Sequence, residues 1–384
     1  IMFIMLFLPF AKNKDFFNYL SGFIGLAFAI SINLFINGFM VQLNQAEIIQ
    51  LLQSGNNSLM NIYSVFLPSI PFAVKALVEL SYLDGLIFIV INALMLALFI
   101  VLAQLMYFKG VIGIEETGAN RKVLSHKAYA KSTLNQNPIL SYTLKELKLM
   151  IRTPIYLMNN ISTVIIMPVI MFASFLPGIS EDAGVESITE LIHYDDPQTM
   201  VWALIVGLAV GLFMSSMNLI TPTAISREGL NVWFMKSIPM SYFDQALAKI
   251  YSGLIISFIG TYLILIPALF ILRAPLIYLV HASLGALAAM IAMNFWGMLV
   301  DIYHPKLIWE QEAAAVKQNI NAVFTMLPGF GLAAGLVALM FMIQDKINEW
   351  MLYGLLLSLF SGLAVLTIYL LHRFSDHGME QIQA

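Results

Sequence analysis

Residues 83–107 read LDGLIFIVINALMLALFIVLAQLMY, and Asp84 is the only charged side chain in this run. A helix rises 1.5 Å per residue, so about 20 apolar residues cross a hydrocarbon core of roughly 30 Å. The stretch therefore predicts a membrane-spanning helix. Similar runs predict seven further spans, near residues 16–41, 154–177, 199–224, 247–271, 276–300, 320–343 and 349–372. The sequence thus predicts an all-α polytopic membrane protein.

The composition agrees with this class. Hydrophobic residues make up 60% of the 384 residues, against about 45–50% in soluble proteins. Charged residues are only 11% of the chain, and there is no cysteine. The missing cysteine excludes disulfides, thiolate metal sites and cysteine nucleophiles.

Lys and Arg are distributed unevenly between the connections. When the connections are assigned alternately to two sides, 16 of the 19 Lys and Arg residues fall on one side. Because these residues accumulate on cytoplasmic loops, the basic side is predicted to be cytoplasmic. This places the C-terminus inside and the protein in the cytoplasmic (inner) cell membrane. The basic side holds Lys12, Lys14, Lys109, Arg121, Lys122, Lys127, Lys131, Lys145, Lys148, Arg152, Arg227, Lys236, Lys249, Lys306, Lys317 and Arg373.

Residues 55–80 predict a re-entrant hairpin at the outer face rather than a span. Pro68 and Pro71 interrupt any helix there, and Lys75 follows closely. A full crossing would export a basic cluster, which the charge rule disfavours. Residues 1–10 are also apolar but too few to span, and are expected to be the last turns of a helix that begins before Ile1.

Two long connections differ in character. The inner segment 108–153 is basic, and apolar residues at 144, 147, 150 and 151 share one face of a helix. This predicts an amphipathic helix at the inner membrane surface. The outer segment 177–198 holds six acidic residues and neither Lys nor Arg. Its spacing matches no calcium-binding loop, so it is interpreted as a solvated acidic loop.

Motifs for catalysis are missing from the sequence. No stretch has the form G-x-x-x-x-G-K-[ST] that cradles nucleotide phosphates, so the chain is predicted to bind no ATP or other cofactor itself. Glu115, Glu116 and Arg121 lack the spacing of intramembrane proteases, and the histidines show no metal-binding spacing. The sequence therefore predicts neither a catalytic nor a metal site.

Polar residues within the spans are costly in lipid and must face protein or a cavity. One interpretation is hydrogen bonding between helices. The other is a polar transport pathway, and its candidates are Asn159, Asn160, Ser215, Asn218 and Asn294.

Two inner loops hold the most distinctive sequence. The first reads SREGLNVWFMKSIPMS from Ser226 to Ser241, and Ser241 with Asp244 predicts the start of a helix. The second reads DIYHPKLIWEQE from Asp301 to Glu312. Each loop carries both signs of charge and one tryptophan. This pattern is typical either of docking to a cytoplasmic partner or of an interfacial aromatic anchor.

These loops resemble a known family. The pattern Ser226-Arg-Glu-Gly…Lys236-Ser-Ile-Pro-Met-Ser241…Ala248-Lys249 is similar to the S-R-E-G…K-S-L-P-I-S…A-K pattern of bacterial type-2 ABC exporter permeases. The segment Lys145-Glu146…Arg152-Thr-Pro-Ile-Tyr156 and the loop from Asp301 to Asn319 resemble the same family. The resemblance covers residues 139–372.

The resemblance implies a six-helix permease unit at 154–384, preceded by a linker at 108–153 and by the last part of a similar unit at 1–107. It implies that a separate cytoplasmic ABC ATPase binds the ATP and docks on the inner loops, and that substrate moves by alternating access. The bilayer is the other implied partner, a second permease copy is left open, and no nucleic acid is expected. The implied docking residues are Arg227, Glu228, Trp233, Lys236, Pro239, Asp244, Lys306, Trp309 and Glu312.

Two alternatives remain at this point. A membrane-embedded enzyme, such as a lipid-modifying transferase or a protease, would need converging acidic, His or Ser groups at one depth. A receptor or assembly factor without transport activity would share the same spans. An adjacent gene for an ATPase with a phosphate-binding loop would distinguish the exporter from both.

Overall fold

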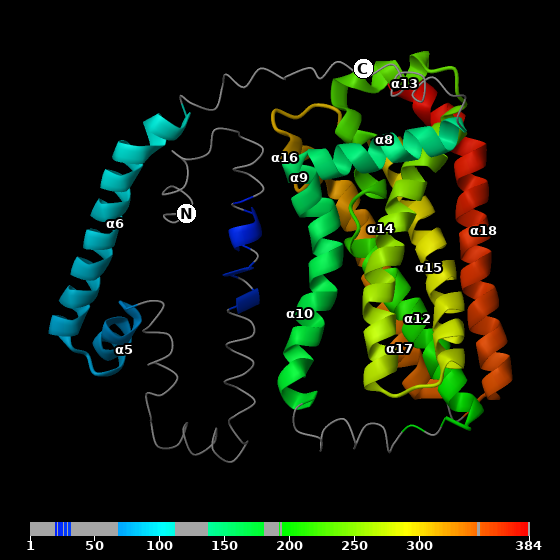
Figure 1. Ribbon diagram of the computed structural model, residues 1–384, viewed down its shortest axis with the longest axis horizontal. Coiled ribbons are helices and arrows are strands. Elements are labelled where there is room, and N and C mark those ends of the chain that lie inside the picture. Colours follow the sequence, from blue (N-terminus) through cyan, green and yellow to red (C-terminus); the bar gives the residue numbers. More distant parts are fainter. Residues whose placement is uncertain are drawn as a thin grey trace, which may run out of the picture. The chain divides into compact units, whose positions relative to one another are not determined.

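The computed structural model describes residues 68–111, 137–179, 192, 194–343 and 346–382, together with scattered positions between residues 20 and 31. Every regular element in these ranges is helical (Figure 1). The chain divides into two compact units, residues 1–123 and 124–384.

In the first unit, two helices follow each other. Helix α5 covers Ile70–Val78 and packs against α6, Tyr82–Val111. Nine residues rise only about 13 Å, so α5 cannot cross a membrane. Residues 55–67 lie outside the described part, so the hairpin as a whole stays a prediction, as does the span 16–41.

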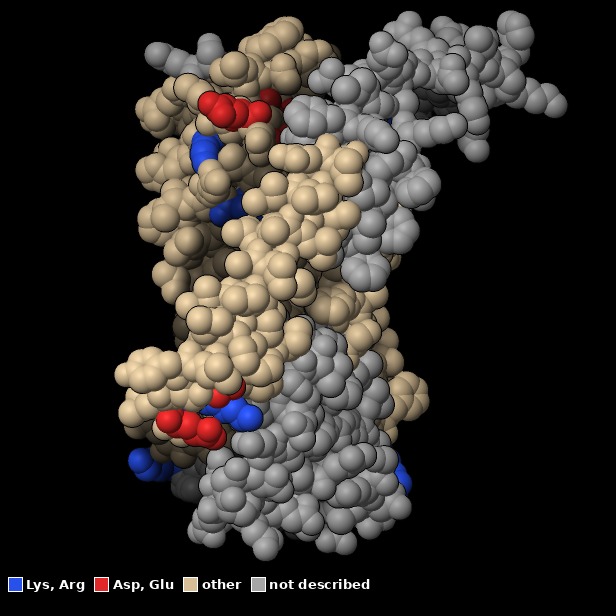
Figure 2. Space-filling model, turned by 90° about the vertical axis from the view of Figure 1, so that its left-hand side faces the viewer, with Lys and Arg blue, Asp and Glu red and all other residues tan. Residues whose placement is uncertain are grey.

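Helix α6 contains the stretch that predicted a span. Its apolar window has no buried residue within the described structure. In the space-filling view of Figure 2, most of the described residues on the visible side are uncharged, and the Lys, Arg, Asp and Glu residues gather toward the two ends. An exposed helix of this composition is stable in lipid and not in water.

The second unit is a helical bundle that begins with a helix running across one end of it (Figure 1). The helices are α8 Pro138–Arg152, α9 Pro154–Tyr156, a π-helical turn Leu157–Ile161, α10 Ser162–Ile179, α12 Pro197–Met217, α13 Val232–Ser237, α14 Tyr242–Ile271, α15 Leu276–Tyr303, α16 Glu312–Val316, α17 Ile320–Ile343 and α18 Glu349–Gln381. Short 3-10 turns at Thr221–Thr223 and Ser226–Asn231 connect α12 to α13.

Seven helices in the described part are long and apolar enough to cross a membrane, and they correspond to seven of the eight predicted spans. The predicted start of α14 is confirmed, because the Ser241 hydroxyl caps the backbone N–H of Asp244 at 3.0 Å. The predicted span 199–224 is too long. Helix α12 ends at Met217, since Asn218 has non-helical backbone angles and its side-chain oxygen binds the N–H of Ile220 instead.

Helix α12 lies at the centre of the unit and packs against α15 and α17. Glycines allow the backbones of α12 and α15 to touch: a Cβ atom at Gly207 would lie 1.9 Å from the carbonyl oxygen of Ala282. In lipid there is little hydrophobic drive between helices, so such close packing holds them together.

The predicted amphipathic helix forms as α8 and extends beyond the apolar positions 144–151, whereas its place at a membrane surface stays a prediction. Tyr142, Thr143, Glu146 and Met150 are the buried residues, and the helix packs against α14. Leu144 and Ile151 remain exposed. The protein-facing side therefore includes a carboxylate that the apolar periodicity did not reveal.

Sidedness can be tested in this naturally cysteine-free chain. Ser237 lies beside α13, and Arg273 lies in the turn between α14 and α15 at the opposite end; both are exposed. If the basic end is cytoplasmic, Arg273→Cys should react with an impermeant maleimide in intact cells, and Ser237→Cys only after permeabilisation. Labelling of both positions in intact cells would overturn the topology.

Candidate functional site

The two loops that carried the sequence motifs lie at the same end of the second unit as α8. Figure 1 shows α8, α13 and α16 together there. We call this end the loop end; it comprises α8 and residues 218–241 and 304–319.

The first loop is attached to the bundle where α12 stops. The side-chain amide of Asn218 donates to the carbonyl of Gly253 at 2.7 Å and to the hydroxyl of Ser257 at 3.0 Å, both on α14. The amide of Asn294 on α15 also donates to Ser257, at 3.3 Å. These bonds fix the beginning of the loop against α14 and α15.

A buried carboxylate holds the next part of the loop. Asp301, at the end of α15, accepts the backbone N–H groups of Ile225 and Ser226 at 2.6 and 3.1 Å. Its other oxygen accepts the Ser226 hydroxyl and the side-chain amide of Asn321, the latter at 2.8 Å. Four donors compensate the burial of this fully enclosed group, and thereby join the loop to α15 and α17.

The second loop closes over the first. The backbone N–H of Lys306 donates to the Ser226 hydroxyl, and the indole N–H of Trp309 donates to the Ser226 carbonyl, each at 2.9 Å. The Trp309 ring covers Gly229, whose φ of +56° and ψ of −136° suit glycine only. The two loops are therefore one body.

Four charged side chains meet beneath this body. The ammonium of Lys249, on α14, is fully buried and lies 3.0 Å from Glu146 Oε1 of α8 and 2.5 Å from Glu228 Oε1 of the first loop. The guanidinium of Arg227 lies 3.7 Å from Glu146 Oε2 and donates to the carbonyl of Ile220 and the hydroxyl of Thr223, both at 2.7 Å. We call Glu146, Arg227, Glu228 and Lys249 the ion cluster.

The four members of the ion cluster are two acids and two bases, and the half-exposed Lys145 lies 3.7 Å from Glu146 Oε1 at its edge. Burial of a charge is costly unless partners compensate it, so each member depends on the others. The Tyr142 ring of α8 lies 5.4 Å from the Lys249 ammonium, and burial raises the pKa of the Tyr142 hydroxyl to about 12. Tyr142 therefore stays neutral and leaves the balance unchanged.

The outer surface of the joined loops is apolar and aromatic. Leu230, Trp233 and Phe234 of the first loop and Ile308 of the second are all more than half exposed. We call these four residues the loop patch. Large apolar side chains held out from a fixed backbone mark either a protein contact or a membrane-interface anchor.

The structure separates the residues predicted to dock a partner. Trp233, Lys236, Pro239 and Glu312 are exposed, and the Lys236 ammonium also binds the carbonyl of Ile382 at 2.7 Å. Arg227 is buried, and Trp309 is turned inward onto Ser226. Lys306 binds the carbonyls of Ala314 and Gln318, Glu228 belongs to the ion cluster, and Asp244 lies in the first turn of α14.

The candidate pathway residues lie within the bundle. Asn160, Ser215, Asn218 and Asn294 are buried, and the amides of Asn218 and Asn294 join α12, α14 and α15 as described above. Asn159 is partly exposed and donates to the carbonyl of Ile155 at 2.6 Å. Asn159 and Asn160 lie in the π-helical turn that immediately precedes α10.

Sequence reasoning did not assign Glu146, Lys249 or Asp301 a role in the site. Glu146 and Lys249 are separated by 103 positions, and no periodicity links them. The usable signal was their place in the family-like motifs. Within the described ranges, no group of three or more His, Asp or Glu side chains could hold a metal ion.

The fold defines the class of the chain: an α-helical, multi-pass membrane protein. No family model, curated protein or solved structure matches the sequence. The functional assignment consequently depends on the geometry of the loop end and on the motifs.

We expect Lys249→Met to destabilise the protein by about 3–5 kcal/mol, because it leaves two buried carboxylates opposite one base. Thermal unfolding in detergent measures this effect. The double variant Glu146→Gln/Lys249→Met restores the balance and should unfold at a higher temperature than Lys249→Met alone. Lys148→Met is the matched control, since Lys148 is an exposed lysine on the same helix, α8. A loss no greater for Lys249→Met than for this control would contradict the ion cluster.

Gly229→Ala should lower the stability by about 1–3 kcal/mol. The new methyl would lie 3.0 Å from the Trp309 ring, and the backbone angles exclude ordinary L residues. Gly354→Ala in α18, where no atom lies within 4 Å of the added carbon, is the control and should be neutral or slightly stabilising, because alanine is favoured over glycine in a helix. Unfolding temperatures that are equal for the two variants would show that the loops are not held as described.

Proposed function

We propose that this chain is the membrane-spanning permease part of an ATP-driven exporter, and that a separate cytoplasmic ATPase docks on the loop patch. The observation that carries the proposal is the combination of an exposed aromatic surface with a buried attachment. The loop patch projects from two loops that Asp301 and Ser226 join into one body. A surface that receives force from a partner needs both features.

Buried contacts supply a route from the loop patch into the bundle. Glu228 connects the first loop to Lys249 on α14, and Lys249 connects to Glu146 on α8. Asp301 connects the same loop to α15. A displacement of the loops would therefore move α8, α14 and α15 together, which is the kind of shift that alternating access requires.

The remaining parts of the proposal come from the sequence. ATP is assigned to the partner because the chain lacks a phosphate-binding loop. The basic loop end is placed in the cytoplasm of a bacterial cell, where such a partner resides. The motif resemblance supports the exporter over an enzyme, which would need converging reactive groups.

Trp233→Glu tests the docking. A carboxylate at the centre of an apolar contact should abolish stimulation of the ATPase by the permease, because truncating or charging a central aromatic residue removes much of an interface's energy. The assay is ATP hydrolysis by an ABC ATPase that is co-expressed and co-purifies with this chain, with and without the permease.

Trp350→Glu is a close control, because Trp350 and Trp233 are both 59% exposed and Trp350 lies at the start of α18, away from the loop end. The control should keep full stimulation. Full stimulation by Trp233→Glu, in protein that elutes normally from a sizing column, would reject the loop patch as the docking surface.

A further inference from the structure

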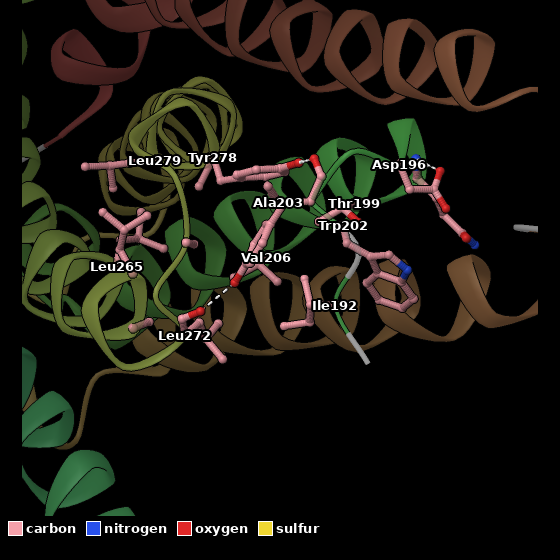
Figure 3. Close-up of a pocket in the computed structure, with 16 residues that line it drawn as sticks. Ile192, Asp196, Thr199, Trp202, Ala203, Val206, Leu265, Leu272, Tyr278 and Leu279 are labelled. Carbon is pink, nitrogen blue, oxygen red and sulfur yellow. Dashed lines mark hydrogen bonds between the residues drawn. The ribbon is translucent and has the colours of Figure 1, made fainter. Parts of the chain in front are cut away.

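A cavity of about 480 Å³ lies at the end of the second unit opposite the loop end. It is enclosed by the first turns of α12, the last turns of α14 and the first turns of α15 (Figure 3). Its volume is within the range of about 300–1,000 Å³ found for small-molecule sites. None of the predicted docking or pathway residues lines it.

The wall of the cavity is apolar. Its large apolar side chains include Trp202, Val206, Leu265, Leu269, Leu272 and Leu279. From Gln198 to Val206 the cavity follows α12 for about 12 Å. Val206 is 45% exposed, so the apolar wall reaches the surface of the bundle. This shape and lining suit an alkyl chain that enters from the bilayer.

The rim of the cavity is polar and fixed. The Tyr194 hydroxyl donates to the carbonyl of Leu272 at 2.5 Å, and the Tyr278 hydroxyl donates to the carbonyl of Tyr194. Figure 3 shows Tyr278 and Leu272 on the two sides of the site, with these hydrogen bonds drawn. Tyr194 is thus held across the rim by both α14 and α15.

The charge at the rim is predominantly acidic. Asp196 lines the cavity, and Asp195 beside it is exposed. One basic residue, Arg273, lies in the turn after α14 between the lining residues Leu272 and Ala274. An anionic head group would be repelled by the two aspartates, whereas an ammonium would be attracted.

We propose that this cavity binds the alkyl chain of a membrane amphiphile whose head group carries an amine, such as phosphatidylethanolamine. Lipid tails are as apolar as leucine, so the chain fills the space without providing selectivity. Selectivity comes from the aspartates at the rim, and the zwitterionic head also offers a phosphate to Arg273. The proposal concerns binding alone and holds whether or not the chain is an exporter.

Photo-crosslinking tests the site. The full chain, purified in detergent, is incubated with phosphatidylethanolamine that carries a diazirine in the middle of one acyl chain, and labelled peptides are mapped by mass spectrometry. We expect labels on the segments 198–206 and 265–272. Unlabelled phosphatidylethanolamine should compete about five-fold better than phosphatidylglycerol, the upper range for one exposed ion pair.

Two sets of variants locate the two parts of the amphiphile. Val206→Trp and Ala268→Trp fill the cavity from different helices and should each reduce labelling, whereas Ala338→Trp, on the exposed face of α17, should not. Asp195→Asn/Asp196→Asn should remove the preference for phosphatidylethanolamine. Asparagine keeps the cap at the start of α12, where Asp196 accepts the N–H of Gln198, so the fold is preserved.

The outcomes are distinct. Labels outside the cavity segments, or equal labelling of the Val206→Trp and Ala338→Trp proteins, would overturn the alkyl-chain site. Equal competition by phosphatidylglycerol would overturn the amine-bearing head group. If a tryptophan variant unfolds, the label positions in the unsubstituted protein and the competition ratio still decide both points.

Discussion

The buried ammonium of Lys249 is the constraint on which the loop end depends. It lies between Glu146 of α8 and Glu228 of the first loop, and the Lys249 side chain is fully buried. A buried cation without partners is strongly destabilising, so α8 and the loop must both approach α14 for the bundle to form. Arg227 completes the charge balance from the same loop. Helix α8, which crosses the others, is thereby fixed to the bundle.

A second set of buried contacts, around Asp301, fixes the two loops to each other so that they present one surface. Asp301 and Ser226 join the two loops to each other and to α15, and Trp309 closes the junction. The polar groups of Asp301, Ser226 and Trp309 are used in bonds between the loops, and the loop patch remains exposed. The structure thus separates residues that hold the loops from residues that can be contacted, and the proposed coupling depends on that separation.

The sequence predicted the fold class well because hydropathy and helix length are local properties. The start of α14 at Ser241 was also predicted correctly, because a helix cap depends only on residues three positions apart. The end of α12 at Met217 was not predicted, because an apolar run does not reveal that the Asn218 side chain will accept the N–H of Ile220. Whether the predicted docking residues contact a partner stays a prediction. A motif does not show which way a side chain turns, so the sequence did not reveal that Arg227 is buried and that Trp309 is only partly exposed and binds Ser226.

The central claim, that the joined loops are the contact for an ATPase, is tested most directly by site-specific crosslinking in the cell. A photoreactive benzoyl-phenylalanine at Phe234 keeps the native ring and adds a benzoyl group, for which there is room because Phe234 is more than half exposed. The account predicts a crosslink to a protein that carries a G-x-x-x-x-G-K-[ST] sequence, and none from the same residue placed at exposed Leu276 at the opposite end. Crosslinks from Phe234 to lipid only, or to a protein without a nucleotide site, would contradict it.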